Sequence, residues 1–284
     1  MTTATASPAV SPVATASDLL DRLANEMRKA ATNPDSDAVH DVRVAIRRTR
    51  ECLKVFAPAF PSSAARTIDK KLSKVLEAAG ELRNLDIAME LLKDSGLPKS
   101  RELKREIRKD RLSRAADFSE MLEKLDVVEK WKSKLAGKEK DFPSPADVAQ
   151  ETLPALAAGF FEAGQSAADP AADPKTLHKF RIRSKKFRYA LELFAPQYGP
   201  TLETRMEVLR NIQTRLGHIN DCFATQDLLD GYRKGHKPLV GQAKEKLERK
   251  ALTQIRAFRA YWKKTMDQAQ KDTWIQYLSH VPTP

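Results

Sequence analysis

The sequence is poor in the residues that characterise disulfide-stabilised, β-rich and membrane-spanning proteins. Its 284 residues include only 10 glycines and 2 cysteines, Cys52 and Cys222. Two cysteines are too few for a disulfide framework and lack metal-ligand spacing, so we expect a reducing cytoplasm. Aromatic residues make up 7% of the chain, and no apolar run approaches the roughly 18 residues of a membrane span. We therefore expect no membrane insertion, no metal and no cofactor.

The abundant residues are Ala, Leu, Lys, Arg and Glu, which favour helices. No stretch combines strand alternation with turn dipeptides, so the predicted fold class is all-α. The predicted helices cover approximately residues 17–32, 37–57, 62–80, 83–95, 100–125, 127–135, 146–166, 174–195, 201–217, 221–233 and 239–278.

Two composition changes suggest how the chain is divided. Residues 1–16 are uncharged and rich in Ala, Thr, Ser and Pro. They lack the basic start and apolar centre of a signal peptide, so we predict a disordered tail. The Pro-containing segment that ends at Pro145 is the best boundary near the middle of the chain. It divides the helical part into residues 17–140 and 141–284.

A repeated segment supports this division. Residues 39–58, VHDVRVAIRRTRECLKVFAP, align without gaps with residues 177–196, LHKFRIRSKKFRYALELFAP, and seven of the 20 positions are identical. A second echo pairs residues 80–84, GELRN, with residues 217–221, GHIND. Two echoes in the same order predict two duplicated α-helical halves.

Each copy of the repeat places cations on one arc of a helix. The first arc contains His40, Arg43, Arg47, Arg50 and Lys54, and the second contains His178, Arg181, Lys185 and Arg188. Apolar positions flank both arcs, which suits the wall of a cleft better than an open surface. Arg48 and Lys186 point further round the helices.

These cationic arcs predict a polyanionic ligand. The chain has 50 Lys and Arg against 38 Asp and Glu, a net charge of +12, and like charges one turn apart destabilise a helix. Guanidinium groups suit phosphate oxygens, and the arc repeats every turn, about 5.4 Å. The aromatic residues of the repeat lie on its apolar arc, so stacking on bases is not expected. The simpler alternative is a solvated helix face, or arginines paired with acidic neighbours.

The two motifs, HxxRxxxRxxR at His40 and HxxRxxxKxxR at His178, together with the Gly80 and Gly217 segments, resemble CHAD domains. The resemblance covers about residues 17–280. It implies two antiparallel four-helix bundles related by a pseudo-two-fold axis, with a basic central cavity. It also implies binding of inorganic polyphosphate, often at polyphosphate granules.

The resemblance assigns the arc residues of both copies to the cavity. Further lining is expected on the helices that follow the two repeats, from Lys71, Lys74, Arg83 and Arg210. Three substitutions in the second copy reduce its similarity to the first and predict weaker phosphate binding there: Lys54 aligns with Glu192, Ile46 with Ser184 and Arg83 with Asn220.

We expect a binding protein rather than an enzyme. The sequence has no GxxxxGK[ST] phosphate loop, no Glu-x-Glu-x-Lys strand of a triphosphate tunnel and no recognisable carboxylate cluster for Mg²⁺. Three alternatives stay open: a basic helical protein associated with nucleic acid, an enzyme of polyphosphate metabolism, and a helical scaffold with incidental charge.

Overall fold

The computed structural model describes residues 11–97, 100–125, 128–136 and 142–281, and within these ranges it is helical with no strand. The all-α prediction is confirmed. The ten α-helices are α1 (Pro12–Thr32), α2 (Ser36–Val55), α3 (Ser62–Asp94), α4 (Arg101–Glu123), α5 (Val128–Leu135), α6 (Pro145–Ala168), α7 (Pro174–Tyr198), α8 (Thr201–Asp230), α9 (Arg233–Thr265) and α10 (Gln268–Leu278), and a 3₁₀ turn covers Ala57–Ala59. None of the helices described is long and apolar enough to cross a membrane.

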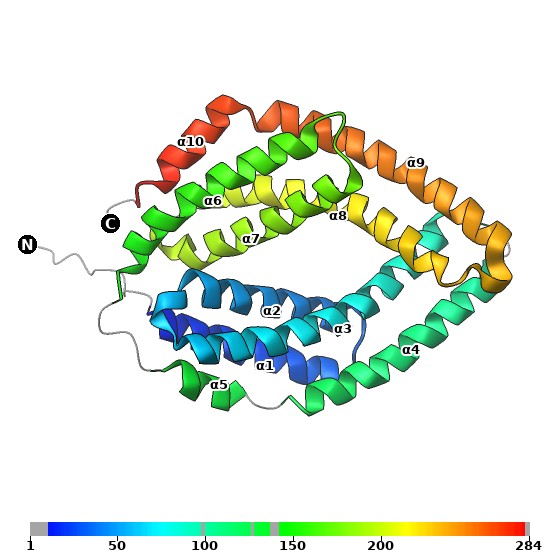
Figure 1. The fold of residues 1–284 in the computed structure, drawn as a ribbon, viewed down its shortest axis with the longest axis horizontal. Helices are drawn as coiled ribbons and strands as arrows, with labels where there is room; N and C mark the ends of the chain where they lie inside the picture. Colours follow the sequence, from blue (N-terminus) through cyan, green and yellow to red (C-terminus); the bar gives the residue numbers. More distant parts are fainter. Residues whose placement is uncertain (1–10, 98–99, 126–127, 137–141, 282–284) are drawn as a thin grey trace, which may run out of the picture.

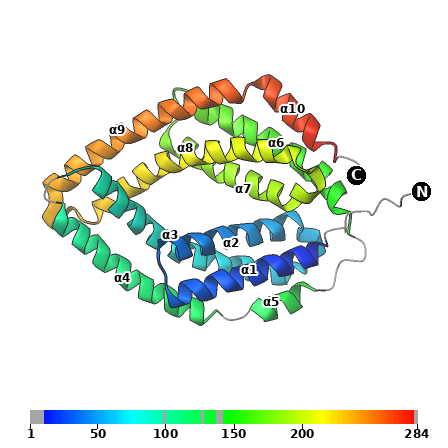
Figure 2. The same cartoon turned by 180° about the vertical axis from the view of Figure 1, so that it is seen from behind.

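The helices form two groups that meet along the middle of the molecule (Figure 1). Helices α1–α5 make up one group and α6–α10 the other, and the groups touch where α2 packs on α7 and α3 on α8. The outer helices α4 and α9 converge with the ends of α3 and α8 at one end of the molecule, as the reverse view also shows (Figure 2). The short helices α5 and α10 pack on α1 and α6, so each group has five helices rather than the four expected.

Two apolar cores hold this arrangement together. The larger core includes buried side chains of α1, α2, α3, α6, α7 and α8. The smaller core lies at the convergent end and combines Leu85 and Leu92 of α3 with Cys222 and Leu229 of α8, together with side chains of α4 and α9. This second core joins the two groups directly.

Buried positions recur in matching helices of the two groups. They recur after 138 residues from α2 to α7, after 137 from α3 to α8 and after 140 from α4 to α9. The following pairs, for example, are buried: Val42 and Phe180, Leu53 and Leu191, Leu82 and Ile219, Leu85 and Cys222, Leu103 and Ala243, Ile107 and Leu247. These offsets define which residues occupy equivalent places.

Two predicted helix breaks were wrong. Helix α3 continues through Gly80, and α8 continues through Gly217. A single glycine in a helix costs only about 1 kcal/mol relative to alanine. Buried residues line one face on both sides of each glycine, and their packing offsets that cost.

Two other boundaries also differ from the prediction. Helix α1 begins at Pro12 rather than at residue 17, because the Ser11 hydroxyl accepts a hydrogen bond from the Ala14 amide at 3.1 Å and caps the helix. The predicted disordered tail therefore ends earlier, and residues 1–10 lie outside the described ranges. The single helix predicted over 239–278 is divided into α9 and α10, and Asp267 caps the second.

The glycines provide a test of the packing in the second group. A Cβ atom at Gly164 would lie 1.8 Å from Cη2 of the buried Trp262, whereas a Cβ at Gly217 would meet nothing within 4 Å. We expect Gly164→Ala to lower the free energy of unfolding by about 1–3 kcal/mol through overpacking. Gly217→Ala should raise it by up to about 1 kcal/mol. Urea denaturation measures both, and effects of equal sign would contradict this packing.

Candidate functional site

Apolar packing turns the two repeated helices so that their cationic arcs face each other. Asp35 caps α2 by accepting from the Ala38 amide at 2.8 Å, and Asp173 caps α7 by accepting from the Thr176 amide at 2.7 Å. The apolar arc of each helix is buried in its own group, as at Val42 and Phe180. The cationic arcs are thereby directed toward the junction of α2 with α7.

Four cations come together at this junction. Arg43 and Arg47 extend from α2, and Arg181 and Lys185 extend from α7. All four are half-buried, and the charges of the three arginines each act on Lys185. We call these four residues the basic cluster.

Burial and mutual repulsion make the charged state of the basic cluster costly. Burial, and then the charges of Arg181, Arg47 and Arg43, lower the pKa of Lys185 to about 6. The same causes, burial first, lower the pKa of Arg43 to about 9. Burial also lowers the pKa of Arg181, and the carboxylate of Asp221 on α8 opposes this effect.

The basic cluster has few polar partners. Among the residues that the structure describes, none of its four members forms an ion pair. Arg43 donates one hydrogen bond from Nη1 to the Leu76 carbonyl at 3.1 Å, and the buried Nε of Arg181 has no hydrogen-bond partner. Buried charges are normally paired, so this arrangement is chemically suited to an anion with several oxygen atoms.

Gly80 gives Arg43 the room that it occupies. A Cβ atom at Gly80 would lie 2.8 Å from Arg43 Nη1, closer than real contacts allow. The guanidinium therefore rests against the backbone of α3. This contact explains a glycine in the middle of a long helix.

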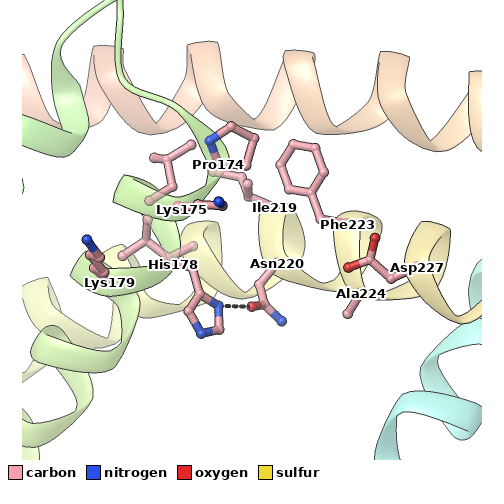
Figure 3. Close-up of a pocket in the computed structure, with 11 residues that line it drawn as sticks. Pro174, Lys175, His178, Lys179, Ile219, Asn220, Phe223, Ala224 and Asp227 are labelled. Carbon is pink, nitrogen blue, oxygen red and sulfur yellow. Dashed lines mark hydrogen bonds between the residues drawn. The ribbon is translucent and has the colours of Figure 1, made fainter.

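His40 and Arg83 lie beside the basic cluster. Burial lowers the pKa of His40, and the positive charges of Arg83, Arg47 and Arg43 lower it further. Arg83 donates to the Ser36 hydroxyl at 2.5 Å. The equivalent pair in the second group is neutral, because His178 Nδ1 and Asn220 Oδ1 form a hydrogen bond of 2.8 Å (Figure 3).

Two arginines of the predicted arcs are already paired. Arg50 binds Asp69 of α3 with two hydrogen bonds, of 2.7 and 3.2 Å. Arg188 donates to Gln213 at 2.8 Å and pairs with Glu192 one turn along its own helix. Their charges are largely compensated within the protein.

Arg48 and Arg210 also have acidic partners. Arg48 crosses from α2 to pair with Glu192 of α7 at 2.8 Å, and Arg210 pairs with Glu203. Both arginines line a separate hollow between α1, α7 and α8. The remaining predicted cations are exposed and form no ion pair within the described ranges: Lys54, Lys71, Lys74 and Lys186.

The sequence interpretation missed two residues beside the basic cluster. Asp221 is the carboxylate that acts on both Arg181 and Lys185. It was visible as the last residue of the second echo, next to Asn220. Tyr189 is buried beside Arg43 and Arg181, and no charge pattern indicated it.

Metal-binding groups were also sought. No three His, Cys, Asp or Glu side chains in the described part of the chain gather as metal ligands would.

Comparison with known proteins agrees with this geometry. The family model for the CHAD domain matches residues 14–230, so the chain belongs to the CHAD domain family. The structure is similar to the crystal structure of the CHAD domain from the plant Ricinus communis, with a TM-score of 0.74 and 20% identity over 95% of this chain and 92% of that chain. It is also similar to PptA from Streptomyces chartreusis, with a TM-score of 0.61 and 16% identity over 88% and 99% of the respective chains. No curated protein matched the sequence.

The repulsion within the basic cluster predicts a stability effect at Lys185. Its folded-state pKa of about 6 lies below the ordinary 10.5, so between these values the unfolded chain binds more protons. Stability should therefore rise with pH across this window, and most of the loss should be present at pH 7. We expect Lys185→Met to raise the free energy of unfolding at pH 7 by about 1–2 kcal/mol and to flatten this pH dependence.

Urea denaturation at several pH values from 6 to 9 measures this effect. Lys186→Met is the matched control, because the neighbouring Lys186 is exposed. A loss of stability in Lys185→Met would show that the cluster is not repulsive.

Proposed function

We propose that this protein binds inorganic polyphosphate without catalysis and that the basic cluster is its central contact. The observation that carries the proposal is the half-burial of four cations with no ion-pair partner among the described residues. Such a site favours an anion that supplies several charge-assisted hydrogen bonds at once. The proposal places the protein in the cytoplasm, at polyphosphate granules.

A phosphate chain suits the site better than a single small anion. Arg43 and Arg47 lie about one helical turn apart, as do Arg181 and Lys185, which corresponds to about 6 Å along each axis. His40 and His178 extend the two rows in the same direction along their helices. Membership of the CHAD family supports the same ligand, because some of its members bind polyphosphate.

Nucleic acid is the alternative ligand to exclude. Proteins that bind single strands without sequence preference usually offer exposed aromatic side chains to the bases. The phenylalanines of the repeat are instead buried: Phe56, Phe180, Phe187 and Phe194. We therefore expect recognition of phosphate without bases, and expect polyphosphate to displace DNA of equal total charge.

Binding of long-chain polyphosphate at several salt concentrations tests the proposal. The native protein should bind tightly, and its affinity should fall steeply as salt rises because counterions are released. A variant with Arg43, Arg47, Arg181 and Lys185 all changed to Gln should lose most of the affinity while circular dichroism shows the same helicity. Equal binding by both proteins, or no binding by either, would refute the site. Hydrolysis or transfer of phosphate during the incubation would refute the absence of catalysis.

Gly80 allows a subtler test of the same site. Gly80→Ala should displace the Arg43 guanidinium and weaken polyphosphate binding several-fold, although alanine favours the helix. Gly217→Ala is the matched control, because it adds the same methyl group to α8 where nothing lies within 4 Å. Equal affinities of the two variants would show that the position of Arg43 does not matter.

A further inference from the structure

A pocket beside the basic cluster has a different chemical character. It lies between the start of α7 and the middle of α8, beneath α9 (Figure 3), and has a volume of about 430 Å³. This volume is within the range of about 300–1,000 Å³ that is common for small-molecule sites. Leu177, Leu216 and Ile219 are buried and contribute to its lining, together with the half-buried Phe223.

The pocket has polar groups at its two ends. At one end His178 is held by its hydrogen bond to Asn220. At the other end Asp227 lies one turn after Phe223 on α8, is exposed, and has no ion-pair partner among the residues described. An occupant therefore meets an apolar wall between a hydrogen-bonding end and a carboxylate.

The first end of the pocket adjoins the basic cluster. His178 precedes Arg181 by one turn on the same arc of α7. Asn220 is next to Asp221, whose charge acts on both Arg181 and Lys185. A ligand that extends from the pocket past His178 consequently reaches the basic cluster.

The equivalent place in the first group is filled by an ion pair. Arg111 of α4 binds Asp86 of α3 at 2.9 Å, both side chains are only 11% exposed, and Arg111 also donates to the Pro34 carbonyl at 2.6 Å. In the buried register, Phe223 stands 137 residues after Asp86 and Ala251 stands 140 residues after Arg111. The second group thus has an aromatic ring and a methyl group where the first has a buried salt bridge.

The outer helix is also attached at a different point in the second group. The residue equivalent to Pro34 is Ala172, and its carbonyl accepts from Arg259 at 3.5 Å. Arg259 lies eight residues beyond Ala251, which is about 12 Å along α9. No long side chain from the place of Arg111 therefore crosses the pocket, and Phe223 borders an open space.

We propose that this pocket binds the base of a purine nucleoside triphosphate whose phosphates enter the basic cluster. The proposal rests on the proposed phosphate site and adds a second class of ligand to it. A flat ring can pack against Phe223 and Ile219, and the Asp227 carboxylate can accept hydrogen bonds from N–H groups of the base. The His178 end then directs the phosphates toward Arg181.

Calorimetric titration with ATP, GTP and tripolyphosphate tests the proposal at one ionic strength without divalent cations. Tripolyphosphate carries at least as much negative charge, so electrostatics alone would make it the tighter ligand. We expect ATP or GTP to bind at least about ten-fold more tightly, a difference of about 1.4 kcal/mol. Nucleotides that bind no more tightly than tripolyphosphate would overturn the proposal.

Two variants locate the preference. Phe223→Ala and Asp227→Asn should each reduce nucleotide affinity several-fold and leave tripolyphosphate affinity unchanged. Asp227 is exposed, so its variant is expected to fold even if loss of the Phe223 ring disturbs packing. Glu90→Gln is the matched control, because Glu90 is exposed and occupies the equivalent place on α3. A preference that persists in Asp227→Asn, or that is lost in Glu90→Gln, would overturn the assignment.

The outcomes separate this proposal from the function on which it rests. If long-chain polyphosphate binds but nucleotides show no preference, the phosphate site stands and the base pocket is wrong. If nucleotides are preferred and long-chain polyphosphate does not bind, the pocket stands and the proposed function is wrong. If none of these ligands binds, both are wrong.

Discussion

The mutual repulsion of four cations between α2 and α7 is the constraint on which the rest of the structure depends. Buried apolar residues hold each of the two helices in place, so the side chains of Arg43, Arg47, Arg181 and Lys185 cannot turn away into solvent. The cost appears in the lowered pKa values of Arg43 and Lys185. Apolar packing on both sides of the junction must offset it for the protein to fold.

The two groups of helices share a register but differ in how they satisfy their polar residues. The first group places Arg83 near His40, and the second places Asn220 on His178. Arg50 is neutralised by Asp69 of α3, whereas Arg188 is neutralised by Glu192 of its own helix. The positive charge is therefore concentrated toward the first group, and the apolar pocket belongs to the second.

The fold class and the cationic arcs could be predicted because both depend on periodicity within single helices. The His40 and His178 repeats contain that information without any tertiary contact. The sequence could not show that Arg50 and Arg188 are paired, because Asp69 and Gln213 are brought to them by other helices. The continuity of α3 was also hidden, since the contact of Gly80 with Arg43 depends on how two helices pack.

The apolar core at the convergent end determines when the cost of the site is incurred. Leu92 and Leu229 pack there with α4 and α9, while the Arg48–Glu192 ion pair ties α2 to α7. With both connections in place, the two groups do not have to close around a ligand, and the spacing of the cations is set during folding. The free energy of bringing like charges together is consequently spent before an anion arrives, and little of the binding energy is needed to organise the site.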